Sequence, residues 1–235
     1  MKILFLSDDF PPHSIGGAGI ITKELAEGLR DEGHKISVIT AVSDRTQRTH
    51  ETSNGISIYP IYSSYPGYLS QYYGGRNRST LSQIRPLLRS IKPDIIHAHN
   101  IHHYISFHAL TLAKAFTNNV FFTAHDAMSF HAGKLTHVYR PHDSTFRSPN
   151  EYQVSWFDEL KCSKKRFNPF RNIAIRAQLK HANKIFAISQ ELEKALRQNS
   201  ITNVTTVHYG IRDRYTNSPV APRHHALTSL IERNV

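Results

Sequence analysis

The chain has 235 residues, 39% of them hydrophobic and 20% charged, which is the composition of a globular protein large enough to bury a core. No apolar run approaches the roughly 20 residues of a membrane helix, and the start lacks the pattern of a signal peptide, so we expect a cytoplasmic protein. A single cysteine, Cys162, excludes an internal disulfide framework, and 29 Lys and Arg against 18 Asp and Glu give a net charge of +11, which predicts attraction to phosphate groups.

The first residues predict a strand, a glycine loop and a helix. The run Ile3–Ser7 is short and apolar, as in a buried parallel strand, and apolar residues recur at helical spacing over Ala18–Glu32. Gly16, Gly17 and Gly19 stand at the entrance of this helix, where bare backbone lets a ligand approach and unpaired N–H groups favour an anion. We therefore expect these glycines to face a phosphate-bearing ligand.

Two common phosphate-binding motifs do not fit this loop. About eight residues, Asp8 to Ile15, separate the strand from the glycines, whereas a dinucleotide fingerprint follows its strand directly and has a carboxylate about 20 residues later. No Gly-Lys-Ser/Thr follows the glycines, as a Walker motif requires. The spacing argues against a nicotinamide enzyme and against an ATPase.

Strands and helices then alternate to the end of the chain. Further strands are predicted at Ile36–Thr40, Ile56–Ile61, Ile95–His99, Val120–Ala124, Ile185–Ile188 and Val204–His208. Further helices are predicted at Leu81–Ile91, Tyr104–Phe116, Ile173–His181 and Gln190–Gln198, with Ser189 as an N-cap and Pro86 causing a kink or a late start. This alternation predicts an α/β fold, a doubly wound, mainly parallel, Rossmann-like sheet with helices on both faces.

Two stretches interrupt the alternation, 63–78 and 134–168. Both are long, follow strand ends and are read as loops that rim a ligand cleft. The second overlaps the most basic part of the chain, residues 161–180, where seven Lys and Arg lie beside aromatic residues. A solvated helix face, a surface for an anionic membrane or acidic acceptor, and nucleic-acid contact all remain open for this stretch, although no nucleic-acid recognition motif accompanies it.

Two groups of histidines lie at the carboxyl ends of predicted strands. His125 and Asp126 end the strand at 120–124, where His125 could bond a substrate hydroxyl and Asp126 could orient its ring, the alternative being a structural pair. A second group runs from His97 to His103 and includes His99, Asn100 and His102. Without a nearby cysteine or carboxylate to complete a ligand set, it predicts a polar strand end lining the cleft and no metal site.

Taken in order, these segments resemble the amino-terminal domain of GT-B glycosyltransferases of family four. The resemblance rests on Lys2–Pro12 with its glycine loop, Pro93–Asn100, Thr123–Asp126, Ala182–Ser189 and Val204–Ile211. It covers residues 1–213. One departure is Tyr209, which stands where the family usually has Asn.

The resemblance implies one half of a GT-B fold that carries out retaining transfer of a sugar from a nucleotide-sugar, with no other cofactor. The glycine loop would face the donor phosphates, His125 would contact the donor sugar as the catalytic residue, and the acceptor cleft would include Asp9, His99, Asn100, Asp126 and Ser189. The acceptor would be a glycan or lipid-linked group in cell envelope polysaccharide or glycolipid biosynthesis, with the protein in the cytoplasm or peripheral at the membrane's inner face.

The organisation expected from this resemblance is an N-terminal domain over 1–213. Residues 214–235 would be a linker or the start of a missing donor-binding domain, the alternative being a terminal helix. The chain would then be a fragment, or work with a separate donor-domain chain. A non-catalytic module that binds glycan or anionic lipid with the same fold is the competing hypothesis.

Overall fold

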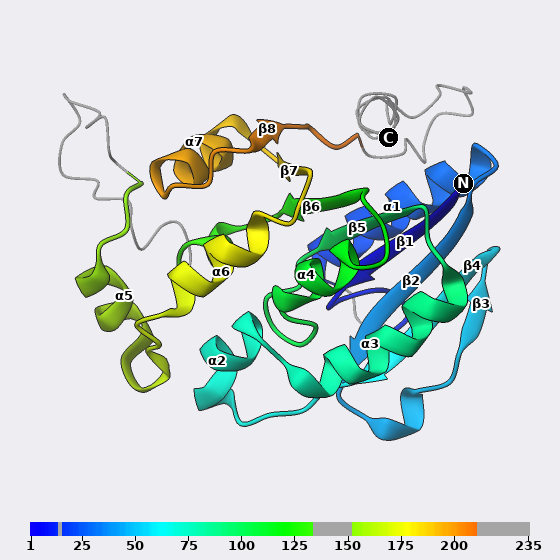
Figure 1. The fold of residues 1–235 in the computed structure, drawn as a ribbon, viewed down its shortest axis with the longest axis horizontal. Helices are drawn as coiled ribbons and strands as arrows, with labels where there is room; N and C mark the ends of the chain where they lie inside the picture. The colour runs from blue at the N-terminus through cyan, green and yellow to red at the C-terminus, as the bar shows by residue number, and fades with distance from the viewer. Residues whose placement is uncertain (14–15, 134–151, 211–235) are drawn as a thin grey trace.

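The structure is a computed structural model that describes residues 1–13, 16–133 and 152–210. In this part of the chain the strands are Lys2–Ser7 (β1), Lys35–Val42 (β2), Glu51–Ser53 (β3), Ile56–Tyr62 (β4), Ile95–His99 (β5), Val120–Ala124 (β6), Lys184–Ala187 (β7) and Val204–Thr206 (β8). They form one sheet in the order β3-β4-β2-β1-β5-β6-β7-β8 (Figure 1). All neighbouring strands are parallel except the edge pair β3 and β4. The mainly parallel sheet is confirmed.

Helices connect the parallel strands. The α-helices are Gly17–Asp31 (α1), Ser70–Gly75 (α2), Arg78–Ile91 (α3), His108–Lys114 (α4), Trp156–Ser163 (α5), Arg171–Leu179 (α6) and Gln190–Gln198 (α7). Short 3-10 helices are Arg45–Gln47 (η1), Gly67–Leu69 (η2), Ala127–Ser129 (η3) and Lys164–Arg166 (η5). Among these described helices none is long and apolar enough to cross a membrane.

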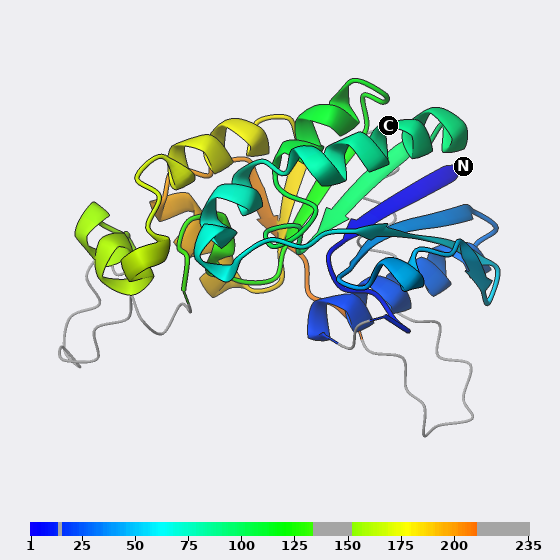
Figure 2. The same cartoon turned by 90° about the horizontal axis from the view of Figure 1, so that it is seen from below.

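The core has two layers, one on each face of the sheet. Ile3 and Phe5 of β1 pack with Leu25 of α1, whereas Leu4 and Leu6 point to the other face. That second layer contains residues from α3, α4, α6 and α7. Figure 2 shows α3, α4 and α6 on one side of the sheet and α1 on the other. The prediction of helices on both faces is confirmed, and burial on both faces explains why β1 is continuously apolar.

The strand order reverses between β1 and β5. From β1 the chain turns to β2 on one side, while β5 pairs with the other side of β1 in register Ser7↔His99. In open α/β sheets, ligands bind beyond the carboxyl ends of strands at such a switch point. A ligand site is therefore expected at the residues that follow β1 and β5.

The structure corrects several local predictions. The helix with Pro86 does not start late: it begins at Arg78, because Asn77 caps it by accepting from the Thr80 amide at 3.4 Å. The helix expected from Tyr104 begins at His108, because the backbone before it is held in a loop by Asp8. The cap at Ser189 is confirmed, with its hydroxyl oxygen 3.2 Å from the Leu192 amide.

Two predicted loops contain short helices. Residues 63–78 hold η2 and α2, and the described part of 134–168 holds α5 and η5. The signal for α5 was a capping box, in which Ser155 and Asp158 bond each other's backbone amides at 3.0 and 3.2 Å. The predicted domain boundary at 213 lies outside the described residues.

Candidate functional site

Two carboxylates hold the ends of β1 and β5 together. Asp8 accepts hydrogen bonds from the backbone amides of His103, Tyr104 and Ile105, at 2.7, 3.1 and 2.7 Å. Asp9 accepts from the side-chain amide of Asn100 at 3.2 Å. The loop after β5 is thus fixed against the loop after β1, at the switch point of the sheet.

The amino terminus of α1 meets the same place. A Cβ on Gly19 would lie 2.7 Å from the backbone oxygen of Asp9, so glycine lets the helix pack closely on the loop after β1. Gly17 is exposed, and a Cβ there would meet nothing within 4 Å. Gly16 is the N-cap without a side-chain cap, and the first turn holds no acidic residue. The open space at Gly17, at the N-terminus of a helix, leaves room for an anion.

A histidine cluster lies under this edge, on the α1 face of the sheet. His97 and His99 are fully buried on β5, with ring centroids 4.1 Å apart. His97 Nε2 lies 2.8 Å from the hydroxyl of Thr123, and His99 Nδ1 lies 3.0 Å from Nε2 of His125. The cluster therefore connects the buried sheet to His125 at the end of β6.

Tyr209 closes this cluster from the segment after β8. Its hydroxyl donates to Thr123 Oγ1 at 3.0 Å, and its ring is stacked on His125 with an interplanar angle of 4°. Hence His125 is held by His99 on one side and by Tyr209 on the other.

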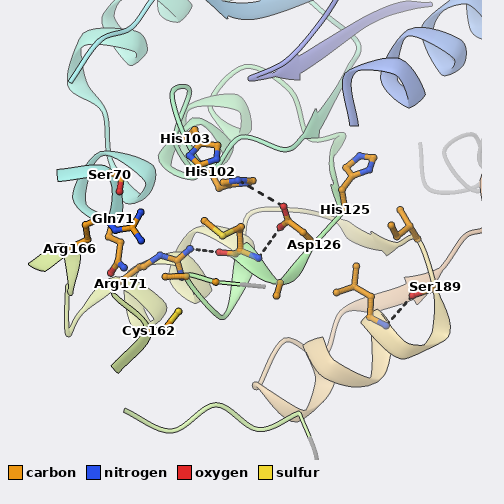
Figure 3. Close-up of a pocket in the computed structure, with 16 residues that line it drawn as sticks. Ser70, Gln71, His102, His103, His125, Asp126, Cys162, Arg166, Arg171 and Ser189 are labelled. Atoms are coloured by element: carbon orange, nitrogen blue, oxygen red, sulfur yellow. Dashed lines mark hydrogen bonds and ion pairs between the residues drawn. The ribbon is translucent and has the colours of Figure 1, made fainter. Parts of the chain in front are cut away.

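A cavity of about 660 Å³ opens beside His125, at the carboxyl ends of β5, β6 and β7 (Figure 3). Its lining combines imidazoles, one carboxylate, two guanidiniums and several hydroxyl or amide groups. The polar lining residues are Ser70, Gln71, His102, His103, His125, Asp126, Arg166, Arg171 and Ser189. A volume of this size accommodates a sugar-sized ligand.

Charge in the cavity comes from arginines and one carboxylate. Burial lowers the pKa of His125 to about 4 and the pKa of His102 well below its usual value, so both imidazoles are neutral at pH 7. Burial also lowers the pKa of Arg171 to about 10, which leaves the guanidinium charged. Neutral imidazoles can donate to and accept from hydroxyl groups, while the guanidiniums favour an anionic group.

The predicted site residues fall into three places. His125, Asp126 and Ser189 line the cavity. Asp9, Asn100, Gly16, Gly17 and Gly19 belong to the neighbouring switch-point group. His99 was expected in the cleft, but it is fully buried and reaches the site only through His125, because its position on β5 points it toward Phe5.

Asp126 does not orient His125 as expected. Its carboxylate accepts from the Met128 amide at 2.8 Å and lies 3.9 Å from Nε2 of His102 (Figure 3). The backbone turns into η3 at this point, which directs the two adjacent side chains to different partners. His99 and Tyr209 hold His125 in its place.

Sequence reasoning missed Arg171 as a cavity residue. Arg171 is 4% exposed, and its guanidinium donates to the backbone oxygen of Met128 and to the Asn172 side chain. The only sequence signal was its place in the basic stretch, because its neighbours come from distant parts of the chain. His102 and His103 belong to the histidine group that was predicted to line the cleft, and both line the cavity. Across the three ranges the structure describes, no group of three or more His, Cys, Asp or Glu side chains is arranged to hold a metal ion.

Comparison with known proteins gives a family match over most of the chain. The sequence model of Glycosyltransferase Family 4 matches residues 15–215. An uncharacterized glycosyltransferase of Methanocaldococcus jannaschii is 33% identical over 101 residues, which are 43% of this chain and 25% of that protein. An uncharacterized 42.6 kDa protein in the cps region of Klebsiella pneumoniae is 28% identical over 150 residues, 56% of this chain and 38% of that protein. The chain thus spans well under half the length of these relatives.

Solved structures share the fold. Sucrose-phosphate synthase from Thermosynechococcus elongatus has a TM-score of 0.58 at 14% identity, over 89% of this chain and 48% of that one. The N-terminal domain of trehalose-6-phosphate phosphatase from Candida albicans has a TM-score of 0.52 at 13% identity, again over 89% and 48%. At these identities the likeness concerns the fold alone, and the match covers about half of each larger structure.

Proposed function

This chain belongs to glycosyltransferase family 4, as an N-terminal domain of GT-B type, and we propose that it transfers a sugar from a nucleotide-sugar to an acceptor once a donor-binding half completes the cleft. The observation that carries the proposal is the cavity beside His125 at the carboxyl ends of the strands, and the open helix terminus at Gly17 meets the loop after β1 at the same edge of the sheet. Residues 1–213 would form the N-terminal domain, and 214–235 would lead toward the second half.

The donor phosphates would lie at the start of α1. Unpaired amides at a helix N-terminus attract anions, and the open space above Gly17 permits close approach. Asp9 and Asn100 flank this position and would bond hydroxyl groups of the donor or acceptor. Stabilising charge on the departing diphosphate is often the largest contribution to such a reaction.

The sugar would be bound at His125. A neutral imidazole at pH 7 can bond a sugar hydroxyl without adding charge, and the lowered pKa of His125 supports that role. Ser189 and Asp126 supply further oxygen atoms to the lining of the cavity. Arg166 and Arg171 favour an acceptor with a phosphate or carboxylate group.

The setting of the reaction follows from the same family relationship. We expect a glycan or lipid-linked acceptor, a role in cell envelope polysaccharide or glycolipid biosynthesis, and a cytoplasmic location. No cofactor beyond the nucleotide-sugar is needed for this chemistry. The donor-binding half would come from a longer form of this protein or from a separate chain.

The test is nucleotide release. The chain would be combined with a donor-binding half and incubated with a panel of nucleotide-sugars and acceptors, and nucleoside diphosphate would be measured. Acceptor-dependent release that His125→Ala lowers supports the proposal. Tight binding of glycan or anionic lipid without any transfer would favour the competing non-catalytic module.

A further inference from the structure

Exposed apolar side chains are concentrated at one end of the described molecule. The described residues include nine large hydrophobic side chains that are exposed, and seven of these nine lie in η2, α2, α5 or around the start of α6. These seven are Tyr68, Tyr72, Trp156, Phe157, Leu160, Phe170 and Ile173. We call the part of the molecule formed by residues 67–75 and 156–173 the basic-aromatic lobe. Figures 1 and 2 show α5 at one end of the molecule with α2 and α6 next along it.

Contacts across the lobe hold its segments together. The Trp156 ring lies 5.0 Å from the ring of Phe157 and 5.5 Å from that of Phe167. The Tyr72 hydroxyl donates to the Phe167 backbone oxygen at 3.4 Å, and Gln71 donates to Ser163 at 2.5 Å. The helix α2 and the segment 156–173, far apart in sequence, are therefore packed together.

Five of the seven charged side chains in the lobe are positive. Lys161, Lys164, Lys165 and Arg166 are exposed, while Glu159 is buried. Asp158 is only partly exposed and is bonded to Ser155 within the capping box. The exposed cations of the lobe therefore lie on the same short segment as most of its exposed apolar side chains, and its two carboxylates are buried or partly buried.

We propose that the basic-aromatic lobe docks on the surface of an anionic lipid bilayer. Exposed Trp, Phe and Leu can enter the boundary between headgroups and acyl chains, and Lys and Arg are attracted to anionic headgroups. A protein partner is less well matched, because lysines are depleted at protein interfaces. Nucleic acid would use the cations and aromatic rings but not Leu160 and Ile173.

The same lobe forms one wall of the cavity, through Ser70, Gln71, Cys162, Arg166 and Arg171. Docking would bring this wall close to the lipid headgroups. The consequence for the reaction, which rests on the proposed function, is that the acceptor is lipid-linked and reaches the cavity from the membrane.

Vesicle co-sedimentation tests the lipid contact without any sugar transfer. We expect the full chain to bind vesicles of phosphatidylcholine with 30% phosphatidylglycerol, to bind pure phosphatidylcholine much more weakly, and to be released by salt. Phe157→Ser should weaken binding by about tenfold, since its exposed ring can no longer enter the lipid. Lys164→Glu with Lys165→Glu should weaken it by at least roughly 25-fold, about fivefold for each basic residue removed.

Matched controls lie elsewhere on the surface. Ile20→Ser removes an exposed apolar residue from α1, and Arg85→Glu with Arg89→Glu makes the same charge change on α3. Both controls should retain vesicle binding. Equal effects of lobe and control variants, or no binding to anionic vesicles, would overturn the proposal. If the chain self-associates without lipid and Phe157→Ser abolishes this, the surface is a contact between two copies of the chain. If short DNA binds the chain and displaces it from the vesicles, the surface binds nucleic acid.

Discussion

The ring of Tyr209 is stacked on the imidazole of His125, with centroids 6.0 Å apart and an interplanar angle of 4°. The two residues come from segments more than eighty positions apart, and the Tyr209 hydroxyl also bonds Thr123, two residues before His125. This contact matters because the family usually has Asn at the position of Tyr209. The aromatic ring gives His125 a flat surface against which to keep its orientation, and Tyr209 is therefore a positioning residue.

Two substitutions at Tyr209 separate its ring from its hydroxyl. Tyr209→Phe keeps the stack and removes the bond to Thr123, so it should lower the free energy of unfolding by about 1 kcal/mol with little change in turnover. Tyr209→Ala also removes the stack and should lower turnover about tenfold further. Urea unfolding and nucleotide release measure the two effects. Tyr68→Phe, at a residue that is 60% exposed, is the control that should change neither.

The glycines at the start of α1 should differ in what they do. Gly17→Val adds side chain to open space, so the fold should remain intact while turnover of the completed enzyme falls. Gly19→Ala pushes a Cβ to 2.7 Å from the Asp9 backbone oxygen and should lower stability itself. Gly75→Ala, also in open space but on α2, should alter neither property. Normal turnover in a folded Gly17→Val protein would remove the donor phosphates from this helix terminus.

His125 should contribute to both stability and turnover. A residue that only faced a cleft would add little to packing, but His125 is the partner of the fully buried His99 at 3.0 Å. His125→Ala leaves that imidazole without its bond and should cost about 1–3 kcal/mol of unfolding free energy. His125→Gln can still bond His99, so it should recover part of the stability while turnover stays low. Full activity in His125→Gln would make His125 a structural residue.

The fold was largely predictable because it depends on local patterns. Buried strands such as β5 and β6 are short apolar runs, and their bounds Ile95–His99 and Val120–Ala124 were predicted without error. The edge hairpin of β3 was missed although Asn54 and Gly55 both have the positive φ that a tight turn requires. That strand is only three residues long and mostly exposed, so its apolar pattern is weak.

The site was less predictable because its contacts join distant segments. The strand ends indicated His125, Asp126 and Ser189, all of which line the cavity. The place of Arg171 depends on a bond to Met128, 43 residues earlier, which no local spacing encodes. The inward direction of His99 depends on which face of β5 it occupies, and neither face could be assigned to the ligand from the sequence.

Stability should fall on acidification. Burial lowers the pKa of His97 from 6.5 to about 3 and that of His125 to about 4, and it lowers the pKa values of His99 and His102 as well. The unfolded chain therefore binds more protons than the folded one below pH 6.5, and stability is lost as the pH falls toward the folded pKa values. Asp8 acts in the opposite sense, because burial raises its pKa to about 7 and its stabilising contribution grows as the pH falls through 7.

Burial also lowers the pKa values of His103 and His108 and raises that of Asp126, so six histidines outnumber two aspartates. We expect the free energy of unfolding to be lower at pH 5 than at pH 7, with each histidine contributing at most roughly 1.4 kcal/mol per pH unit. Urea unfolding at several pH values gives the slope. His97→Gln should reduce it, and His208→Gln, at an exposed position, should not. The number of protons that the unaltered chain takes up on unfolding is an independent measure of how many histidines are neutral in the folded state. The absence of proton uptake near pH 6 would contradict a neutral histidine cluster.

The 235-residue polypeptide, studied alone, should not transfer sugar. The family resemblance places the groups that hold the nucleotide diphosphate in a second half, and this chain matches 48% of the sucrose-phosphate synthase structure. The described residues supply one helix terminus for the phosphates and one wall for the sugar, so charge on the leaving diphosphate would be stabilised from one side only. Nucleotide-sugar should bind weakly, with a Kd near the millimolar range, about −4 kcal/mol.

Adding a donor-binding half in trans should raise nucleotide release, and without that half only background hydrolysis should be measured. Transfer by the highly purified polypeptide, at a rate that the added half does not change, would require a complete catalytic site within these residues.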